Sequence, residues 1–304
     1  MQIEQIYTGC LAEAAYYIES DGEVAIVDPL RDVTPYIEQA QQDGARIRYV
    51  LETHFHADFV SGHLDLAQKT AASIVYGPTA QPDFNAHIAQ DGELLQLGKV
   101  QIKVLHTPGH TMESSTYLLL DEQGSPHALF TGDTLFIGDV GRPDLAVKTN
   151  LSREDLAGHL FDSLRTKIMP LPDAVTIYPG HGAGSACGKN MSKETIDTLG
   201  NQKQQNYALQ ADLSKADFVQ AVTSGLVTPP QYFPKNAQLN KLGYDSIDEV
   251  LARGVVGLDV AAFSSLVTQN EPLVLDTRPA AQFVAGHIPG ALWIGLDDNF
   301  APWV

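Results

Sequence analysis

Up to residue 182 the chain alternates short apolar runs with turn residues, a pattern typical of many strands interrupted by a few helices. Strands are predicted over 14–20, 23–29, 48–54, 73–77, 115–121, 127–136 and 174–182, with two more inside 92–110. Helical spacing predicts helices over 33–44, 63–72 and 151–172. Because neighbouring strands pair and helices are interspersed, we expect an α+β fold with two helix-covered sheets, not a doubly wound parallel sheet.

The pattern changes in the last third of the chain. Apolar spacing is helical from 193 to 265, with a proline-rich interruption at 227–236, and a new strand is predicted at 272–277. A chain of 304 residues suggests about two domains, which agrees with this change.

Charge and cysteine content restrict the partners. The formal net charge is −18, from 37 acidic and 19 basic side chains, which argues against nucleic acid and anionic membranes as partners. The two cysteines do not make a disulfide framework. We find neither a secretory signal pattern nor an apolar run of about 18–20 residues, so we expect a reducing, cytoplasmic setting.

Imidazole and carboxylate side chains recur where predicted strands end in loops. The loop after the strand at 48–54 carries the pattern His-x-His-x-Asp, and three more such side chains stand beside glycines further on. The six are His54, His56, Asp58, His110, Asp133 and His181. Imidazole nitrogen and carboxylate oxygen bind zinc and iron(II) alike. The sequence therefore predicts a metal site, which we expect Asp28 to orient through hydrogen bonds.

Four short segments, THFHAD, TPGHT, TGDTLF and YPGHG, resemble the ordered metal motifs of the metallo-β-lactamase superfamily. The resemblance covers about residues 1–230 and implies an αββα sandwich with a metal cleft along one edge. Many dinuclear members carry His-x-His-x-Asp-His, where the last histidine holds a second metal. Phe59 stands at that position here, which favours a single metal.

Longer segments, ETHFHADFVSGHLDLA, GDVGRPDL and HGAGSACGKNMS, resemble the persulfide dioxygenases, in particular the bacterial members fused to rhodanese domains. The resemblance implies one iron(II) per chain, oxidation of glutathione persulfide or a similar persulfide with O₂ to sulfite and free thiol in sulfide detoxification, and a homodimer as a candidate assembly. It implies His54, His110 and Asp133 as iron ligands. His56, Asp58 and His181 are then expected to be catalytic side chains that position water, oxygen or the ligands.

Four further residues are candidate substrate contacts. Arg142 and Lys189 are cations in loops near the predicted cleft, and either could pair with a carboxylate of a glutathione-like tail or cap its loop. Cys187 could line the cleft or be a small buried hydrophobe. Tyr178 could donate a hydrogen bond near the site or belong to the core.

The segment LVLDTRPAAQFVAGHIPGALWI resembles the opening of a rhodanese domain. We therefore expect a catalytic domain over 1–230, a linker over 231–257 and an incomplete α/β rhodanese-like domain over 258–304. No cysteine follows Cys187, so this segment cannot transfer sulfur through a cysteine thiolate. We expect the chain to be a fragment of a longer protein, with a degenerate rhodanese domain as the alternative.

Two other functions compete with the dioxygenase. A zinc-dependent thioester hydrolase of the glyoxalase II type would use the same ligand types, although Phe59 argues against its second metal. A non-catalytic sulfur carrier with a structural metal is the third, but structural zinc sites usually close all four positions with cysteine or histidine.

Overall fold

The computed structural model describes residues 1–145, 151–296 and 300, and it divides into two compact units, Met1–Tyr244 and Asp245–Val304. The strands of the first unit are β1 Gln2–Thr8, β2 Glu13–Ser20, β3 Glu23–Val27, β4 Arg46–Leu51, β5 Ser73–Tyr76, β6 His87–Ile88, β7 Leu94–Leu97, β8 Val100–His106, β9 Ser115–Leu120, β10 Pro126–Gly132, β11 Thr176–Pro179 and β12 Asp197–Thr198. Its helices are α1 Thr34–Gln42, α2 His63–Thr70, α3 Arg153–Ser163, α4 Leu199–Gln205, α5 Lys215–Thr223 and α6 Phe233–Leu242.

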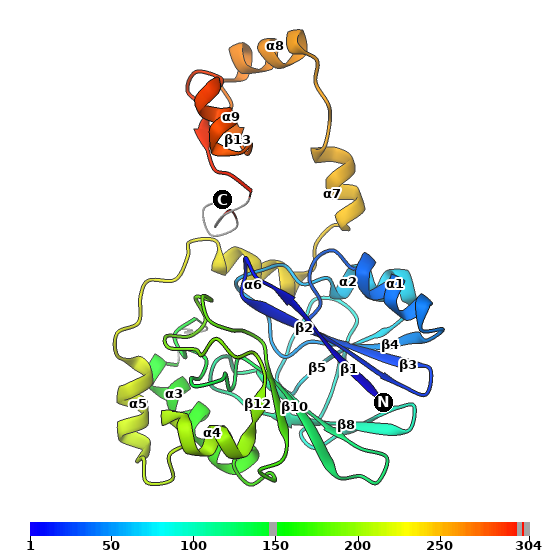
Figure 1. The fold of residues 1–304 in the computed structure, drawn as a ribbon, viewed down its shortest axis with the longest axis vertical. Coiled ribbons are helices and arrows are strands. Elements are labelled where there is room, and N and C mark those ends of the chain that lie inside the picture. The colour runs from blue at the N-terminus through cyan, green and yellow to red at the C-terminus, as the bar shows by residue number, and fades with distance from the viewer. Residues whose placement is uncertain (146–150, 297–299, 301–304) are drawn as a thin grey trace. The chain divides into compact units, whose positions relative to one another are not determined.

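Two six-stranded sheets form the centre of the first unit (Figure 1). Their strand orders are β1-β2-β3-β4-β5-β6 and β12-β11-β10-β9-β8-β7. In β2, Tyr16 and Ile18 pack into the core between the sheets, whereas Ala15 and Tyr17 pack toward α1 and α2. Helices α3 and α5 cover the outer face of the second sheet. The predicted αββα sandwich is confirmed, because alternate residues of the strands are buried on both faces.

Two elements of the first unit differ from the predicted pattern. Strand β1, which was not predicted, pairs antiparallel with β2 along its whole length. In place of the single helix predicted at 151–172, the chain forms the α-helix α3, which ends at Ser163, followed by a π-helical stretch, Leu164–Ile168. Its N-terminus has a capping box in which Ser152 and Asp155 satisfy each other's backbone amides.

Helix α6 lies inside the predicted linker 231–257 but packs as part of the first unit. Phe233 at its start is 3% exposed and contacts Phe136 and Cys187, and Asn240 near its end is fully buried. The first unit therefore extends past the predicted boundary at residue 230, because this short helix buries one face against the loops at the sheet ends.

The second unit contains α7 Ile247–Gly254, α8 Val260–Asn270, α9 Ala280–Ala285 and the parallel pair β13 Leu275–Asp276 and β14 Leu292–Trp293. Strand β13 lies in the segment 272–277 where a strand was predicted. Of the described residues in its three helices, none is buried. The rhodanese-like identity of 258–304 stays a prediction. Within the described part of both units, no helix is long and apolar enough to cross a bilayer.

Candidate metal centre

The candidate ligands converge because four strands end at the same edge of the sandwich. His54, His56 and Asp58 follow β4, His110 follows β8, Asp133 follows β10, and His181 follows β11. Glycines allow the close approach of these strand ends. A Cβ on Gly132, whose φ is +48°, would lie 2.5 Å from Thr53 Oγ1, and one on Gly180 would lie 2.8 Å from Asp133 Oδ1.

His54, His110 and Asp133 form what we call the open set. Their potential ligand atoms lie within 4.8 Å of one another. Asp133 Oδ2 is 3.4 Å from His110 Nε2 and 4.0 Å from His54 Nε2. Among the described residues this buried oxygen has no hydrogen-bond partner. Three converging lone pairs without a proton donor between them fit a metal cation.

Hydrogen bonds on the far side of each imidazole favour the tautomer that a metal needs. His110 Nδ1 donates to the carbonyl oxygen of Arg142 at 2.8 Å. Thr53 Oγ1 donates to Asp28 Oδ2 at 2.7 Å, so it accepts from His54 Nδ1 at 3.0 Å. Burial lowers the pKa of His54 well below its usual value and keeps this ring neutral. Both Nε2 atoms thus offer a lone pair to the open set.

Asp28 orients the metal loop, as predicted. Its two carboxylate oxygens accept from the backbone N–H and the hydroxyl of Thr53, each at 2.7 Å. Asp28 has a left-handed φ of 49°, which aspartate tolerates better than most residues. The last residues of β3 therefore position the first histidine after β4.

His181 connects the open set to Asp58. Its Nδ1 is 2.8 Å from Asp133 Oδ1, and its Nε2 is 2.7 Å from Asp58 Oδ2. Burial opposes a charge on this ring, but the two carboxylates outweigh burial and raise the pKa of His181 well above its usual value. Burial raises and the surrounding imidazoles lower the pKa of Asp133, with a net result well below its usual value. Both nitrogens of His181 thus serve hydrogen bonds.

His56 groups with Asp28 and Glu52 in a second buried cluster, which we call the enclosed set. His56 Nε2 is 3.0 Å from Asp28 Oδ1 and 3.7 Å from Glu52 Oε2, and all three residues are at most 2% exposed. Burial lowers the pKa of His56, but Asp28 and Glu52 outweigh it and raise this pKa to about 9. Burial raises the pKa of Glu52 to about 8. Phe59 packs on His56, with the ring centroids 4.4 Å apart.

A cleft of about 360 Å³ reaches the open set at His110. Its walls combine apolar, polar and charged side chains from both sheets' loops and from α6. The lining residues are Phe55, Ala57, Thr79, Gln81, His110, Thr111, Glu113, Leu145, Ala237, Gln238 and Lys241. A small molecule in this cleft would contact a candidate metal ligand directly.

The structure engages both predicted substrate cations elsewhere. Arg142 is 3% exposed; its guanidinium pairs with both oxygens of Asp144 at 2.7 Å and donates to the carbonyls of Ala186 and Val227. Lys189 Nζ donates to two carbonyl oxygens at the end of α5. Neither residue lines the cleft at His110. Both line a separate hollow of about 430 Å³.

Cys187 and Tyr178 also lie apart from that cleft. Cys187 is 1% exposed, and its Sγ lies within 4.8 Å of the ligand atoms of Asp58 and His181. Burial and nearby carboxylates raise the pKa of its thiol well above the usual value, so it stays protonated. Tyr178 is partly buried and packs against the core, where its ring stacks on Phe130 at a centroid distance of 5.2 Å.

Helix α6 contributes a residue to the site that the sequence pattern did not predict. Asn240 accepts from Ser61 N at 2.9 Å and donates to the carbonyl oxygens of His56 and Phe59 at 2.8 Å. Pro234 in the first turn could have marked a helix start. Nothing in the local sequence pairs this helix with a loop that lies about 180 residues earlier.

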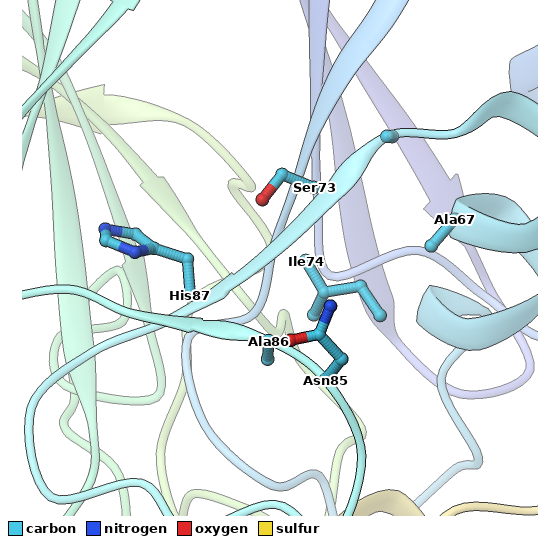
Figure 2. A pocket seen from close by; sticks show the side chains of 7 residues that line it. Ala67, Ser73, Ile74, Asn85, Ala86 and His87 are labelled. Carbon is cyan, nitrogen blue, oxygen red and sulfur yellow. The ribbon is translucent and has the colours of Figure 1, made fainter.

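A second hollow of about 420 Å³ lies between α2 and the β5–β6 edge. Figure 2 shows its lining, with Ser73 and Ile74 from β5, Ala67 from α2, and the segment 85–87. His87 is the one imidazole among these lining residues, and its Nε2 is 2.5 Å from Glu93 Oε1. The residues that line this hollow include no set of metal ligands, so we place the candidate site at the open set.

Comparison with known proteins identifies relatives over most of the first unit. A sequence model described as "Metallo-beta-lactamase superfamily" matches residues 8–181. A probable hydroxyacylglutathione hydrolase of Schizosaccharomyces pombe is 33% identical over 181 residues, which are 58% of this chain and 66% of that protein. The chain therefore spans slightly less than two thirds of that relative. A hydroxyacylglutathione hydrolase of Rhodopseudomonas palustris (strain HaA2) is 30% identical over 67% of this chain and 86% of its own length.

One solved structure resembles both units. It is the crystal structure of a metallo-beta-lactamase from Staphylococcus aureus subsp. aureus COL, with a TM-score of 0.83 and 35% sequence identity. The alignment covers 99% of this chain and 86% of that chain.

Proposed function

The chain belongs to the metallo-beta-lactamase superfamily, and from this premise we propose that it is an iron(II)-dependent persulfide dioxygenase. Its substrates are a low-molecular-weight persulfide, such as glutathione persulfide, and O₂. Together with one water molecule they give the free thiol, sulfite and two protons. The proposal follows from the resemblance of the segments around His54, Arg142 and Cys187 to the persulfide dioxygenases. It includes a cytoplasmic location.

The observation that carries the proposal is the contrast between the open set and its neighbours. The open set offers two imidazoles and one carboxylate whose lone pairs converge beside a cleft. A second metal would need ligands that are committed elsewhere: His181 uses both nitrogens in hydrogen bonds, and Phe59 has no ligand atom. Two histidines and one carboxylate with free positions are typical of iron(II) enzymes that use O₂.

His54, His110 and Asp133 would hold the metal. When bound, iron(II) would supply redox chemistry with O₂, which redox-inert zinc does not supply, and a coordination position for the persulfide sulfur.

The surrounding residues orient this set. The Nδ1–H of His181 holds Asp133 Oδ1 and leaves Oδ2 directed at the two Nε2 atoms. Asp58 Oδ2 accepts from the other side of the same ring, so two buried carboxylates share one imidazolium and the ring stays fixed. Asn240 fixes the loop that carries Asp58 by bonding the backbone on either side of it.

The test combines metal analysis with oxygen uptake. Protein purified without added metal should contain one iron per chain, and an oxygen electrode should register O₂ consumption with glutathione persulfide. Sulfite and glutathione should appear in equal amounts. Two metals per chain, or no oxygen uptake by the iron-loaded protein, would overturn the proposal.

A zinc-dependent thioester hydrolase is the second candidate, and the names of the relatives favour it. The two relatives described above, which are named as a probable hydroxyacylglutathione hydrolase and a hydroxyacylglutathione hydrolase, are 33% and 30% identical to this chain. Zinc-loaded protein that hydrolyses S-lactoylglutathione without consuming oxygen would establish this alternative. The same assay on the iron-loaded protein separates the two candidates in one experiment.

A further inference from the structure

We propose that Glu113 and Lys241, which both line the cleft at His110, recognise a zwitterionic end of the substrate. Such an end carries an ammonium and a carboxylate on one carbon atom. This inference rests on the proposed function in one respect: the other end of the substrate is taken to be a persulfide whose sulfur is directed at the open set.

The cleft has the size and lining of a small-molecule site. Its volume of about 360 Å³ lies near the lower limit of ordinary ligand pockets. Phe55, Ala57, Leu145 and Ala237 give it apolar walls, and His110 connects it to the candidate metal site. A thiol with a short body could therefore put its sulfur at His110 and its other end among the polar residues.

Lys241 supplies the cation. It lies in the last turn of α6, lines the cleft and is partly buried. In the described ranges its ammonium forms no ion pair within 4.0 Å, whereas Lys167, Lys203 and Lys215 each pair with an aspartate. In a protein with a net charge of −18, such an ammonium at a cleft wall is available for a carboxylate from the ligand.

Glu113 supplies the anion. It lies in the loop that follows His110, and its Oε1 accepts from the backbone N–H of Phe55 at 3.4 Å, which anchors one oxygen. Over the described residues Oε2 has no hydrogen bond, and no ion pair within 4.0 Å joins Glu113 to Lys241. The two charges are therefore both available to a ligand that lies between them.

This charge pattern selects a class of ligand. Apart from His110, the lining has one acidic and one basic side chain. A zwitterionic end satisfies both, whereas a ligand with only a carboxylate leaves Glu113 unpaired, and one with only an ammonium leaves Lys241 unpaired. Because Arg142 and Lys189 are held by internal partners, Lys241 takes the role that the sequence analysis gave to them.

The experiment measures binding of three free thiols to the full-length, metal-loaded protein by anaerobic calorimetry. Glutathione has the zwitterionic end, 3-mercaptopropionate has only a carboxylate, and cysteamine has only an ammonium. Three variants accompany the wild type: Lys241→Gln, Glu113→Gln and, as the matched control, Lys235→Gln, which changes an exposed lysine on the same helix outside the cleft lining.

We expect Lys241→Gln to weaken glutathione and 3-mercaptopropionate binding about tenfold and to leave cysteamine unchanged, since one charge-assisted hydrogen bond is lost. Glu113→Gln should weaken glutathione and cysteamine about tenfold and leave 3-mercaptopropionate unchanged. Lys235→Gln should bind all three thiols as the wild type does. Circular dichroism of each variant checks that the fold is intact.

Equal glutathione affinity in the wild type, Lys241→Gln and Glu113→Gln would overturn the inference. So would wild-type protein that binds the two analogues as tightly as glutathione. Charge-dependent thiol binding without oxygen uptake on any persulfide would support the subsite and overturn the dioxygenase, so the two failures are distinguishable.

Discussion

The open set and the enclosed set use the same kinds of side chain in opposite ways. Both consist of imidazole and carboxylate groups whose potential ligand atoms lie within 4.8 Å of one another, and both are buried. The open set, His54, His110 and Asp133, borders a cleft and presents lone pairs without a proton between them. The enclosed set, Asp28, Glu52 and His56, does not line that cleft, and its imidazole is charged next to carboxylates.

The difference teaches that ligand-type residues alone do not identify a metal site. Hydrogen bonds decide the role: His54 and His110 are held through Nδ1 by neutral oxygens, whereas the Nε2 of His56 faces a carboxylate at 3.0 Å. Changes in the open set should therefore affect metal binding, and changes in the enclosed set should affect stability.

The largest effect is expected from His54→Ala. Removing one of three ligands should abolish iron binding and oxygen uptake together, while circular dichroism shows that the fold is retained. Metal analysis and an oxygen electrode measure both losses, and His87→Ala, which changes an exposed imidazole, serves as the control. Oxygen uptake at wild-type iron loading would contradict the assignment of the open set.

The next effect is expected from Asp28→Asn in the enclosed set. The variant keeps the shape and the tolerance for the left-handed φ of 49°, but it leaves the buried charge of His56 without its nearest partner. We expect a loss of about 3 kcal/mol in the free energy of unfolding, measured by urea denaturation of metal-free protein.

Asp212→Asn, at an exposed position, should leave the free energy of unfolding within about 0.5 kcal/mol of the wild type. A loss below about 0.5 kcal/mol for Asp28→Asn would mean that the enclosed set does not stabilise the fold.

An intermediate effect concerns pH and His63, which adjoins the enclosed set at 3.7 Å from Glu52. Burial lowers the pKa of His63 to about 3, so this ring is neutral in the folded protein. The unfolded chain takes up its proton near pH 6.5. Stability from this group is thus present above about pH 6.5 and is lost as the pH falls, by up to about 1.4 kcal/mol per pH unit.

Urea midpoints between pH 5 and pH 7 test this slope. His63→Gln should flatten the acid side of the profile, and His127→Gln, at an exposed position, should leave the wild-type slope. An unchanged slope in His63→Gln would show that other groups cause the acid sensitivity.

The smallest effect is expected from Tyr178→Phe, outside both sets. Its ring packs between the sheets on Phe130 and Tyr16, so loss of the hydroxyl should change the free energy of unfolding by less than about 0.5 kcal/mol. The KM for persulfide should stay at the wild-type value. A several-fold rise in KM would show instead that the Tyr178 hydroxyl contributes to substrate binding.

The sequence predicted the sandwich and the approximate place of the site because both depend on local patterns. The continuous apolar run in β2 indicates two buried faces, and His54, His110 and Asp133 stand in the loops that follow apolar strands. What the sequence could not predict depends on distant partners. The carbonyl oxygens of Ala186 and Val227 that hold Arg142 leave no trace in residue types.

The cleft walls were missed for the same reason. Glu113 stands next to a predicted ligand motif, but Lys241 reaches the same cleft from a helix that the composition assigned to a linker. A proline-rich segment precedes this helix, and its few apolar residues contact loops instead of a regular sheet face. Its sequence therefore lacks a clear helical pattern of apolar residues.

The hydrogen bonds of Asn240 have a consequence for the order of events during synthesis. The residue that fixes the carbonyl of His56 is made 184 positions later, when the strands of both sheets have already left the ribosome. A nascent chain can therefore assemble its sandwich early, but its metal loop is completed only by one of the last elements of the unit. Metal binding at the open set would then follow translation of α6.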